Sequence, residues 1–316
     1  MTKLALLIAV DNPVKSGKSS SEADARLFAD ALRSYWNFND DEVVLLTSAG
    51  SNKATRAEVE RQIKRIEGLN LKQLIVGFWG VGIHQQGDDK RRFCLADYKA
   101  KNAKSTTVSL QSLLSAAMRL GARDVCFILD GRPISENGEY WRADEGDCKT
   151  IERYIRKTAP GFRTAALASC SASESPIDVN PGKVGLFTHS LVQGMDEFAR
   201  RYQGSFDSVA GFAIQTTTRK AAELGKKQQP YFESAGDGDI RFDITQGFRQ
   251  DSSSVVPNVQ DSLKDKDEPD LGNETSIALD KDKGCKKATS KLALTLIGIG
   301  VAVAVAALAT FIALKL

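Results

Sequence analysis

Thiol-based nucleophilic chemistry in this chain would draw on its five cysteines and two histidines. A cysteine thiolate assisted by a histidine attacks carbonyl groups, as in peptide hydrolysis. The cysteines are scattered and odd in number, and no pair has the spacing of a metal site; they are Cys94, Cys126, Cys148, Cys170 and Cys285. The sequence therefore predicts a reducing compartment, no disulfide scaffold, and neither a metal nor a cofactor.

Two apolar runs that break into glycine-containing turns mark the place where such chemistry is expected. Leu74–Phe78 leads into Trp79-Gly80-Val81-Gly82, and Val125–Leu129 leads into Asp130-Gly131-Arg132-Pro133. Short apolar runs of this kind are typical of buried parallel strands, whose C-terminal ends form the mouth of an open α/β sheet. Such sheets bind their ligands at that mouth.

The elements that position these runs alternate between strand and helix from Leu4 to Phe242, which implies parallel strands with right-handed crossovers. The other expected strands are Leu4–Val10, Val43–Leu46, Thr164–Ala168 and Ile240–Phe242, with a hairpin strand at Phe93–Asp97. The first expected helix begins at Ser21. The further expected helices are Thr55–Ile66, Leu110–Leu120, Ile151–Lys157, Leu186–Phe198 and Asp207–Leu224. We expect Ser21 and Asp207 to cap their helices.

Composition divides the chain into three parts and limits its function. The first apolar run is too short for a signal peptide and lacks its cleavage site, so a strand explains it better. We expect a globular domain over residues 1–245 and a disordered linker rich in Ser, Asp and Lys over residues 246–290. A net charge of +3 gives no support to nucleic-acid binding.

Residues 291–316 are expected to anchor the chain in a membrane. The uncharged run Leu292–Leu314 is long enough, at about 1.5 Å per residue, to cross a bilayer core as one helix. Lysines gather on its N-terminal side, which predicts a single-pass anchor with the globular domain in the cytoplasm. Small residues recur every fourth position, at Gly298, Ala302 and Ala306. They permit self-association of the helix, although small residues are also common in any membrane span.

Several motifs, in their order and spacing, resemble the caspase-like family of cysteine peptidases, which includes caspases, metacaspases and bacterial caspase homologues. The resemblance covers roughly residues 3–243 and implies a three-layer sandwich with a mostly parallel sheet between helices. The matching segments are Glu22-Ala23-Asp24-Ala25, Gly80-Val81-Gly82, Arg92-Phe93-Cys94-Leu95-Ala96-Asp97, Leu129-Asp130-Gly131-Arg132, Ala166–Glu174 and Gly185-Leu186-Phe187-Thr188.

The catalytic dyad of this family falls on two residues that cannot perform its chemistry. The resemblance places the family's histidine at Val81 and its cysteine at Arg132, 51 residues apart, and caspases have a separation of about 50. Valine does not titrate, and arginine is neither a nucleophile nor a base at physiological pH. The resemblance therefore implies a catalytically inactive member.

Two alternatives for this region remain open. His84 and Cys170 could form a relocated dyad, against the simpler interpretation of a loop histidine and a packed thiol. Cys126, within a strand, should be buried and inert, and we expect no role for His189. Arg132 could hold a carboxylate or phosphate, or pair with Asp130 and support the loop.

The sequence thus predicts a membrane-tethered, caspase-like pseudopeptidase with a binding or regulatory role, such as a scaffold, a decoy or a sensor. Its partner would be a protein or a peptide. The alternative is an active cysteine-type endopeptidase that uses Cys170 and His84.

Overall fold

The computed structural model describes residues 2–11, 20–84, 91–119, 121–132, 145–158, 161–171, 174–180 and 184–245. The chain divides into two compact units, Met1–Asp265 and Lys266–Leu316, and all described residues belong to the first. The predicted linker at 246–290 and the predicted anchor at 291–316 lie outside the described residues. Within the described ranges, no helix has the length and apolar character needed to cross a membrane.

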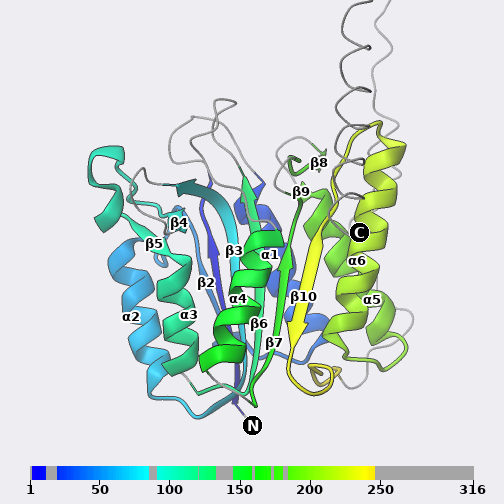
Figure 1. The fold of residues 1–316 in the computed structure, drawn as a ribbon, viewed down its shortest axis with the longest axis horizontal. Coiled ribbons are helices and arrows are strands. Elements are labelled where there is room, and N and C mark those ends of the chain that lie inside the picture. The colour runs from blue at the N-terminus through cyan, green and yellow to red at the C-terminus, as the bar shows by residue number, and fades with distance from the viewer. Residues whose placement is uncertain are drawn as a thin grey trace, which may run out of the picture. The chain divides into compact units, whose positions relative to one another are not determined.

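A mostly parallel sheet forms the centre of the described unit (Figure 1). Its strand order is β10-β7-β6-β3-β1-β2, and all neighbours are parallel except β10 with β7. Two further strands, β4 and β5, extend antiparallel from the end of β3. The strands are β1 (Thr2–Ala9), β2 (Val43–Leu46), β3 (Leu71–His84), β4 (Arg91–Cys94), β5 (Thr107–Ser109), β6 (Asp124–Arg132), β7 (Arg163–Ala168) and β10 (Tyr231–Ala235), and β8 (Asp178–Asn180) pairs with β9 (Val184–Gly185) in a separate ribbon.

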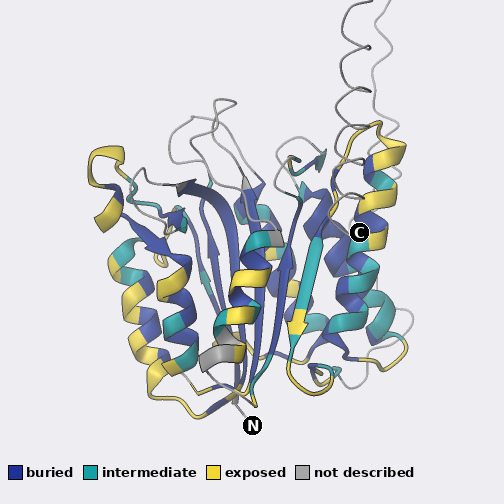
Figure 2. Ribbon diagram, viewed as in Figure 1, coloured by how far each residue is buried: buried dark blue, intermediate teal, exposed yellow. Residues whose placement is uncertain are grey.

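Helices cover both faces of the sheet, which confirms the predicted three-layer α/β arrangement (Figure 2). One face packs against α2 (Arg56–Glu67), α3 (Leu110–Arg119) and α4 (Glu145–Thr158). The other packs against α1 (Ser21–Tyr35), α5 (Leu186–Ala199) and α6 (Phe206–Glu223). Successive side chains of a strand point to opposite faces. Accordingly, Leu4, Leu6 and Ile8 join the first core, and Ala5, Leu7 and Ala9 join the second.

Several predicted element ends are wrong, and the polar contacts explain why. Ser21 is the first residue of α1 rather than its cap, and the Oγ atom of Ser20 contacts carboxylates instead of a backbone N–H. The cap of α6 is Ser205, whose Oγ accepts from the Ser208 N–H at 3.0 Å, so Asp207 lies in the first turn. Glu145 begins α4 six residues before the predicted Ile151.

The last strand of the sheet is also not the predicted one. It is β10, and Ile240–Phe242 form a strap beneath the sheet instead. The strap is held by Phe206 N–H to Ile240 O and by Phe242 N–H to Gly204 O, both at 2.9 Å. The Phe242 ring stacks on Trp36 with centroids 4.5 Å apart. The apolar pattern of the strap thus reflects packing against α1 and α6, and its backbone pairs with Ser205 through an isolated bridge at Arg241 rather than with a strand of the sheet.

A half-buried ion pair ties the strap to the N-terminal edge of the sheet. Arg163 on β7 donates Nε and Nη2 to the two oxygens of Asp124 on β6, at 2.7 and 2.6 Å, and its Nη1 donates to the Asp239 carbonyl at 2.9 Å. The Gln73 amide on β3 donates to the Arg241 carbonyl at 2.7 Å. Three neighbouring strands and the strap are therefore connected by polar side chains.

Gly204 is expected to be the glycine of the strap region least tolerant of a side chain. A Cβ atom at this position would lie 1.8 Å from the Phe242 carbonyl oxygen, which is part of the strap backbone. Gly204→Ala should lower the free energy of unfolding by about 2 kcal/mol or more, because overpacking forces the backbone to move. Gly211→Ala in α6, where no atom lies within 4 Å, is the control and should stabilise by about 0.5–1 kcal/mol. Urea unfolding of both variants measures the difference.

Asp207 is expected to make stability depend on pH. Burial and the neighbouring Asp239 carboxylate raise the pKa of Asp207. Its protonated form therefore stabilises the fold, and this contribution is lost as pH rises from the unfolded value through the folded one. In Asp207→Asn, the unfolding free energy relative to the natural protein should increase as pH rises above about 4, the ordinary pKa of an aspartate. A flat difference, equal to that of the exposed neighbour Asp237→Asn, would contradict this assignment.

Candidate functional site

The C-terminal ends of β3 and β6 lie side by side at the edge of the sheet opposite the strap. Their parallel register pairs Trp79 with Asp130, Gly80 with Gly131, and Val81 with Arg132. The two predicted loops are thus the last residues of longer strands, a correction to the sequence-based boundaries. Glycines favoured the loop prediction, whereas the alternation of Val81 and Ile83 with glycine would have indicated continued strand.

Val81 is a packed side chain. It is 3 % exposed and clusters with Ile83, Cys94 and Ala103, with Tyr98 packed at the border. These partners come from β3 itself and from the segment that β4 and β5 enclose. The position that the resemblance assigns to a base is therefore part of a small apolar core, where a neutral side chain is favourable and a charged one is not.

Arg132 ends β6 directly opposite Val81, but its side chain lies outside the described residues. The predicted alternatives for it, anion binding or pairing with Asp130, accordingly stay predictions. Asp130 is 1 % exposed, so its carboxylate lies within the protein rather than at an open mouth.

Trp79 connects this edge to the helix layer behind it. Its indole Nε1 donates to the Thr188 hydroxyl on α5 at 2.9 Å, and its ring lies 5.5 Å from that of Phe28 on α1. The ring occupies the space above Gly77, where a Cβ atom would be 2.4 Å from the indole. The absence of a side chain at Gly77 leaves the space that the indole fills. The bond to Thr188 joins the turn that follows Leu74–Phe78 to the segment Gly185-Leu186-Phe187-Thr188.

Asp24 makes a second connection between the sequence motifs. Its buried carboxylate accepts from the Gly185 N–H at 2.6 Å and from the Ser20 hydroxyl at 2.8 Å. The same hydroxyl lies 2.9 Å from Asp178 on β8. Asp24 therefore joins the start of α1 to the start of α5, and its role in this structure is positional.

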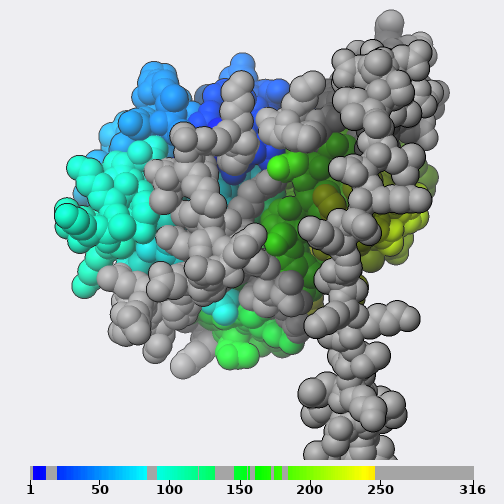
Figure 3. Space-filling view, turned by 90° about the horizontal axis from the view of Figure 1, so that it is seen from above, coloured from blue at the N-terminus to red at the C-terminus, as the bar shows by residue number. Residues whose placement is uncertain are grey.

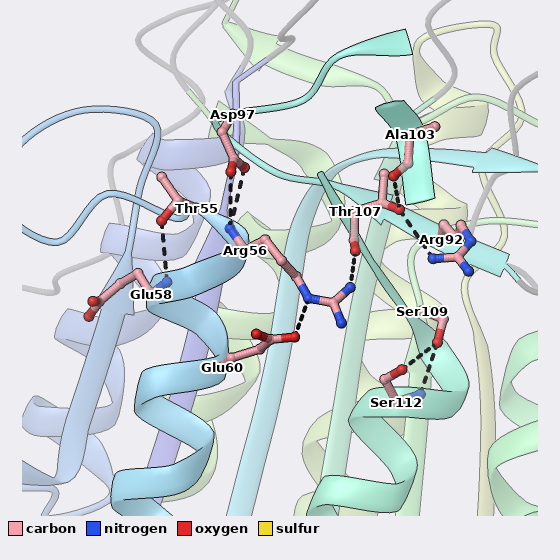
Figure 4. A network of polar contacts seen from close by, with 10 residues as sticks. All are labelled: Thr55, Arg56, Glu58, Glu60, Arg92, Asp97, Ala103, Thr107, Ser109 and Ser112. Atoms are coloured by element: carbon pink, nitrogen blue, oxygen red, sulfur yellow. Dashed lines mark hydrogen bonds and ion pairs between the residues drawn. The ribbon is translucent and has the colours of Figure 1, made fainter. Parts of the chain in front are cut away.

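The hairpin segment noted in the sequence ends in Asp97, whose carboxylate bonds to the backbone at the start of α2, as Figure 4 shows. Both oxygens of Asp97 accept from the Arg56 N–H, at 3.3 and 3.4 Å, at the first residue of α2. The Arg56 guanidinium reaches across to the Thr107 carbonyl on β5 and pairs with Glu60. The Arg92 side chain on β4 is buried and donates to the Thr107 hydroxyl at 3.4 Å. This network fixes the β4–β5 arm against α2.

The two residues of the alternative dyad, Cys170 and His84, belong to the ends of strands that are not neighbours in the sheet. Cys170 follows β7 and His84 ends β3, and β6 lies between those strands. Ala168, Leu129 and Phe78 share one row of the sheet, so Cys170 is two residues beyond that row and His84 is six. With about 4.8 Å between strands and 3.3 Å per residue, the two backbones are about 16 Å apart. The His84 side chain lies outside the described residues.

The described cysteines are all buried. Burial raises the pKa of Cys94 to about 12 and that of Cys126 well above its ordinary value, which confirms that Cys126 is an inert core residue. The Cys170 thiol is fully buried and donates to the Glu174 carbonyl at 3.7 Å. His189 is 3 % exposed, within α5, and lies in the core rather than at the surface. Within the described ranges, no three His, Cys, Asp or Glu side chains are grouped to hold a metal ion.

An open hollow of about 650 Å³ lies at the N-terminal edge, away from this site. Its charged lining includes Lys72, Arg123 and the Asp124–Arg163 pair. The helices α2 and α3 end beside it, and helix C-termini attract cations. The basic side chains are therefore explained without a ligand.

Comparisons with known proteins support the fold alone. No family model matches the chain, and no curated protein matches it. Among solved structures, it is similar to protein GSU0716 from Geobacter sulfurreducens, with a TM-score of 0.52 and 18 % sequence identity, over 78 % of this chain and 98 % of that one.

Viewed from above, the cyan and teal surface of residues around the β4–β5 arm and the green to yellow surface of the later helices lie on opposite sides of the described unit (Figure 3). The edge brings together Val81, the backbone of Arg132, Trp79 and buried Asp130. None of the described side chains among them is a thiol, a hydroxyl or an imidazole, the groups on which the acyl transfer of a cysteine or serine peptidase depends.

The four described cysteines are expected to be unreactive in the native protein, because a buried thiol forms little thiolate. At pH 8, an alkylating reagent should modify Cys94, Cys126, Cys148 and Cys170 much more slowly before than after unfolding in guanidinium. Peptide mass spectrometry locates the modified residues. Rapid native modification of Cys170 alone would contradict this and would favour the relocated dyad.

Proposed function

We propose that the chain is a caspase-like pseudopeptidase with a binding or regulatory role, held at a membrane by its C-terminal segment. The observation that supports this most directly is the pairing of Val81 with Arg132 at the ends of adjacent parallel strands. The positions that the family resemblance assigns to a base and a nucleophile are neighbours, and neither residue can take that role.

Packing at Val81 further supports an inactive domain. A catalytic base must reach its substrate, within about 3 Å or through one water molecule. Val81 instead packs into an apolar cluster and is 3 % exposed. A domain that had merely lost one group would keep the open position around it, whereas here the position belongs to the core.

The membrane part of the proposal rests on the sequence of residues 292–314, which form an uncharged run long enough to cross a bilayer. Lysines before this run favour a cytoplasmic domain. Tethering gives a binding domain a high local concentration of membrane-bound partners, so that weak contacts become effective.

The test compares the natural full-length protein with Cys170→Ala, Arg132→Cys and the double variant Val81→His/Arg132→Cys. Each is mixed with a peptide library that carries Asp, Arg or Lys before the reporter group. We expect no cleavage by the natural protein and no change in Cys170→Ala. The variants are also treated with a thiol-directed acylating probe. If the probe labels the double variant more than it labels Arg132→Cys, the two positions still face a peptide cleft.

Thermal unfolding of each variant shows whether it is folded, which matters because Val81→His places a polar ring among apolar side chains. Cleavage by the natural protein that disappears in Cys170→Ala would overturn the inactive assignment. Extraction of the full-length protein from membranes by alkaline carbonate would overturn the membrane anchor independently.

A further inference from the structure

An exposed group of lysines stands beside the candidate edge. The 3-10 helix η2 (Ala100–Ser105) connects β4 to β5 and appears as the short teal coil between them in Figure 1. We use the term lysine turn for Lys53, Lys99, Lys101 and Lys104. All four are exposed, and Figure 2 shows the η2 coil largely in yellow. Lys53 comes from a different segment, which is joined to the same arm because the neighbouring Ala54 carbonyl accepts from the Ala96 N–H at 2.9 Å.

The charge of the lysine turn is not neutralised locally. None of its four ammonium groups forms an ion pair with a residue in the described ranges. The nearest acid along the chain, Asp97, directs both oxygens to the backbone N–H of Arg56. Three exposed positive charges, Lys99, Lys101 and Lys104, therefore lie on one short segment, and Lys53 adds a fourth from another segment.

The backbone beneath these lysines is fixed. The Lys99 N–H donates to the Thr106 hydroxyl at 3.0 Å, and the Thr107 hydroxyl donates to the Ala103 carbonyl at 2.6 Å. Ala103 and Tyr98 also pack into the apolar cluster of Val81. The residue that stands at the family's base position thus helps to hold the lysine turn in place, so that no ordering of the backbone is needed when the lysines bind.

We propose that the lysine turn is a docking surface for the anionic phospholipid headgroups of a membrane. Lysine ammonium groups are point charges on long stems and suit a fluid array of phosphates, whereas planar, bidentate recognition of one partner favours arginine. The large apolar side chains exposed in the described part are Leu69, Tyr202 and Leu224, none of which belongs to the lysine turn. Contact would therefore be electrostatic and without insertion.

This proposal rests on the membrane tether of the proposed function, which favours lipid over an acidic protein or a nucleic acid. As a flexible chain, the 45 residues of the predicted linker at 246–290 would span about 40 Å. The 14 residues of β3, which run the height of the sheet, span about 45 Å. The two lengths are comparable, so the lysine turn can reach the bilayer that holds the anchor.

The test uses the full-length protein reconstituted in nanodiscs of phosphatidylcholine, with or without 30 % phosphatidylserine (about a third of the lipid). Hydrogen exchange is measured over residues 98–105, at low and high salt. The variant Lys99→Gln/Lys101→Gln/Lys104→Gln removes the surface, and Lys64→Gln/Lys72→Gln/Lys227→Gln removes the same charge from exposed positions elsewhere. Reconstitution into the neutral nanodiscs reports the tether by itself.

We expect protection of residues 98–105 only with phosphatidylserine, and its loss at high salt. The triple variant of the turn should shift the docked-to-free ratio by about a hundredfold, since each lysine near an anionic surface contributes about 1 kcal/mol. Equal protection in neutral lipid, or equal loss in both triple variants, would overturn the proposal. Protection of residues 98–105 by a polyaspartate peptide or an oligonucleotide, without protection by anionic lipid, would also overturn the proposal. Failure to enter neutral nanodiscs would overturn the tether instead, and soluble protein mixed with anionic vesicles would still test the lysine turn.

Discussion

The parallel pairing of β3 with β6 is the constraint on which the rest of the structure depends. It runs through nine residue pairs, from Gln73 opposite Asp124 to Val81 opposite Arg132. A slip of one residue would exchange the two faces of a strand. Trp79 would then leave the α1–α5 side, where it contacts Phe28 and Thr188, and Phe78 would leave its contact with Phe93. The register is fixed because both faces are buried.

The same pairing explains how the spacing of positions 81 and 132 can be kept whatever residues stand there. Backbone hydrogen bonds keep positions 81 and 132 adjacent whatever their side chains are. Local packing then determines which side chains are favourable there, and Val81 packs into the apolar cluster beneath the β4–β5 arm. Geometry that could align a base and a nucleophile is here used to anchor an arm that carries charge on its outer surface. Fold and chemistry are thus separable in this chain, in keeping with the general independence of the two.

Much of the fold could be predicted from hydrophobic period alone. Val43–Leu46 was predicted with its observed bounds, and Val59, Ile63 and Ile66 mark the buried face of α2 as their spacing indicates. Errors arose where tertiary contacts override local signals. Ile240 and Phe242 are apolar because they pack on α1 and α6, and no local pattern separates that from a strand. Similarly, β10 has side chains of intermediate burial and gave no clear period.

The candidate site was predictable in position but not in character. Motif order and spacing pointed to Val81 and Arg132, and the structure places them as register partners. The burial of Val81, however, depends on Cys94 and Ala103, which reach it only because β4 turns back along β3. Likewise, the bond from Trp79 to Thr188 joins residues 109 positions apart, a contact that only the complete fold creates.

The strap has a mechanical consequence. The described chain ends at Thr245, whose N–H is bonded to the Tyr35 carbonyl at the base of α1. Tension applied to the chain beyond Thr245 would load that bond first, and then the Phe242–Gly204 and Ile240–Phe206 bonds and the stacked Trp36 ring. The line of force passes through the N-terminal edge of the sheet and bypasses Val81 and the lysine turn. A pull along the tether would thus peel away the strap while leaving the opposite edge of the molecule unloaded.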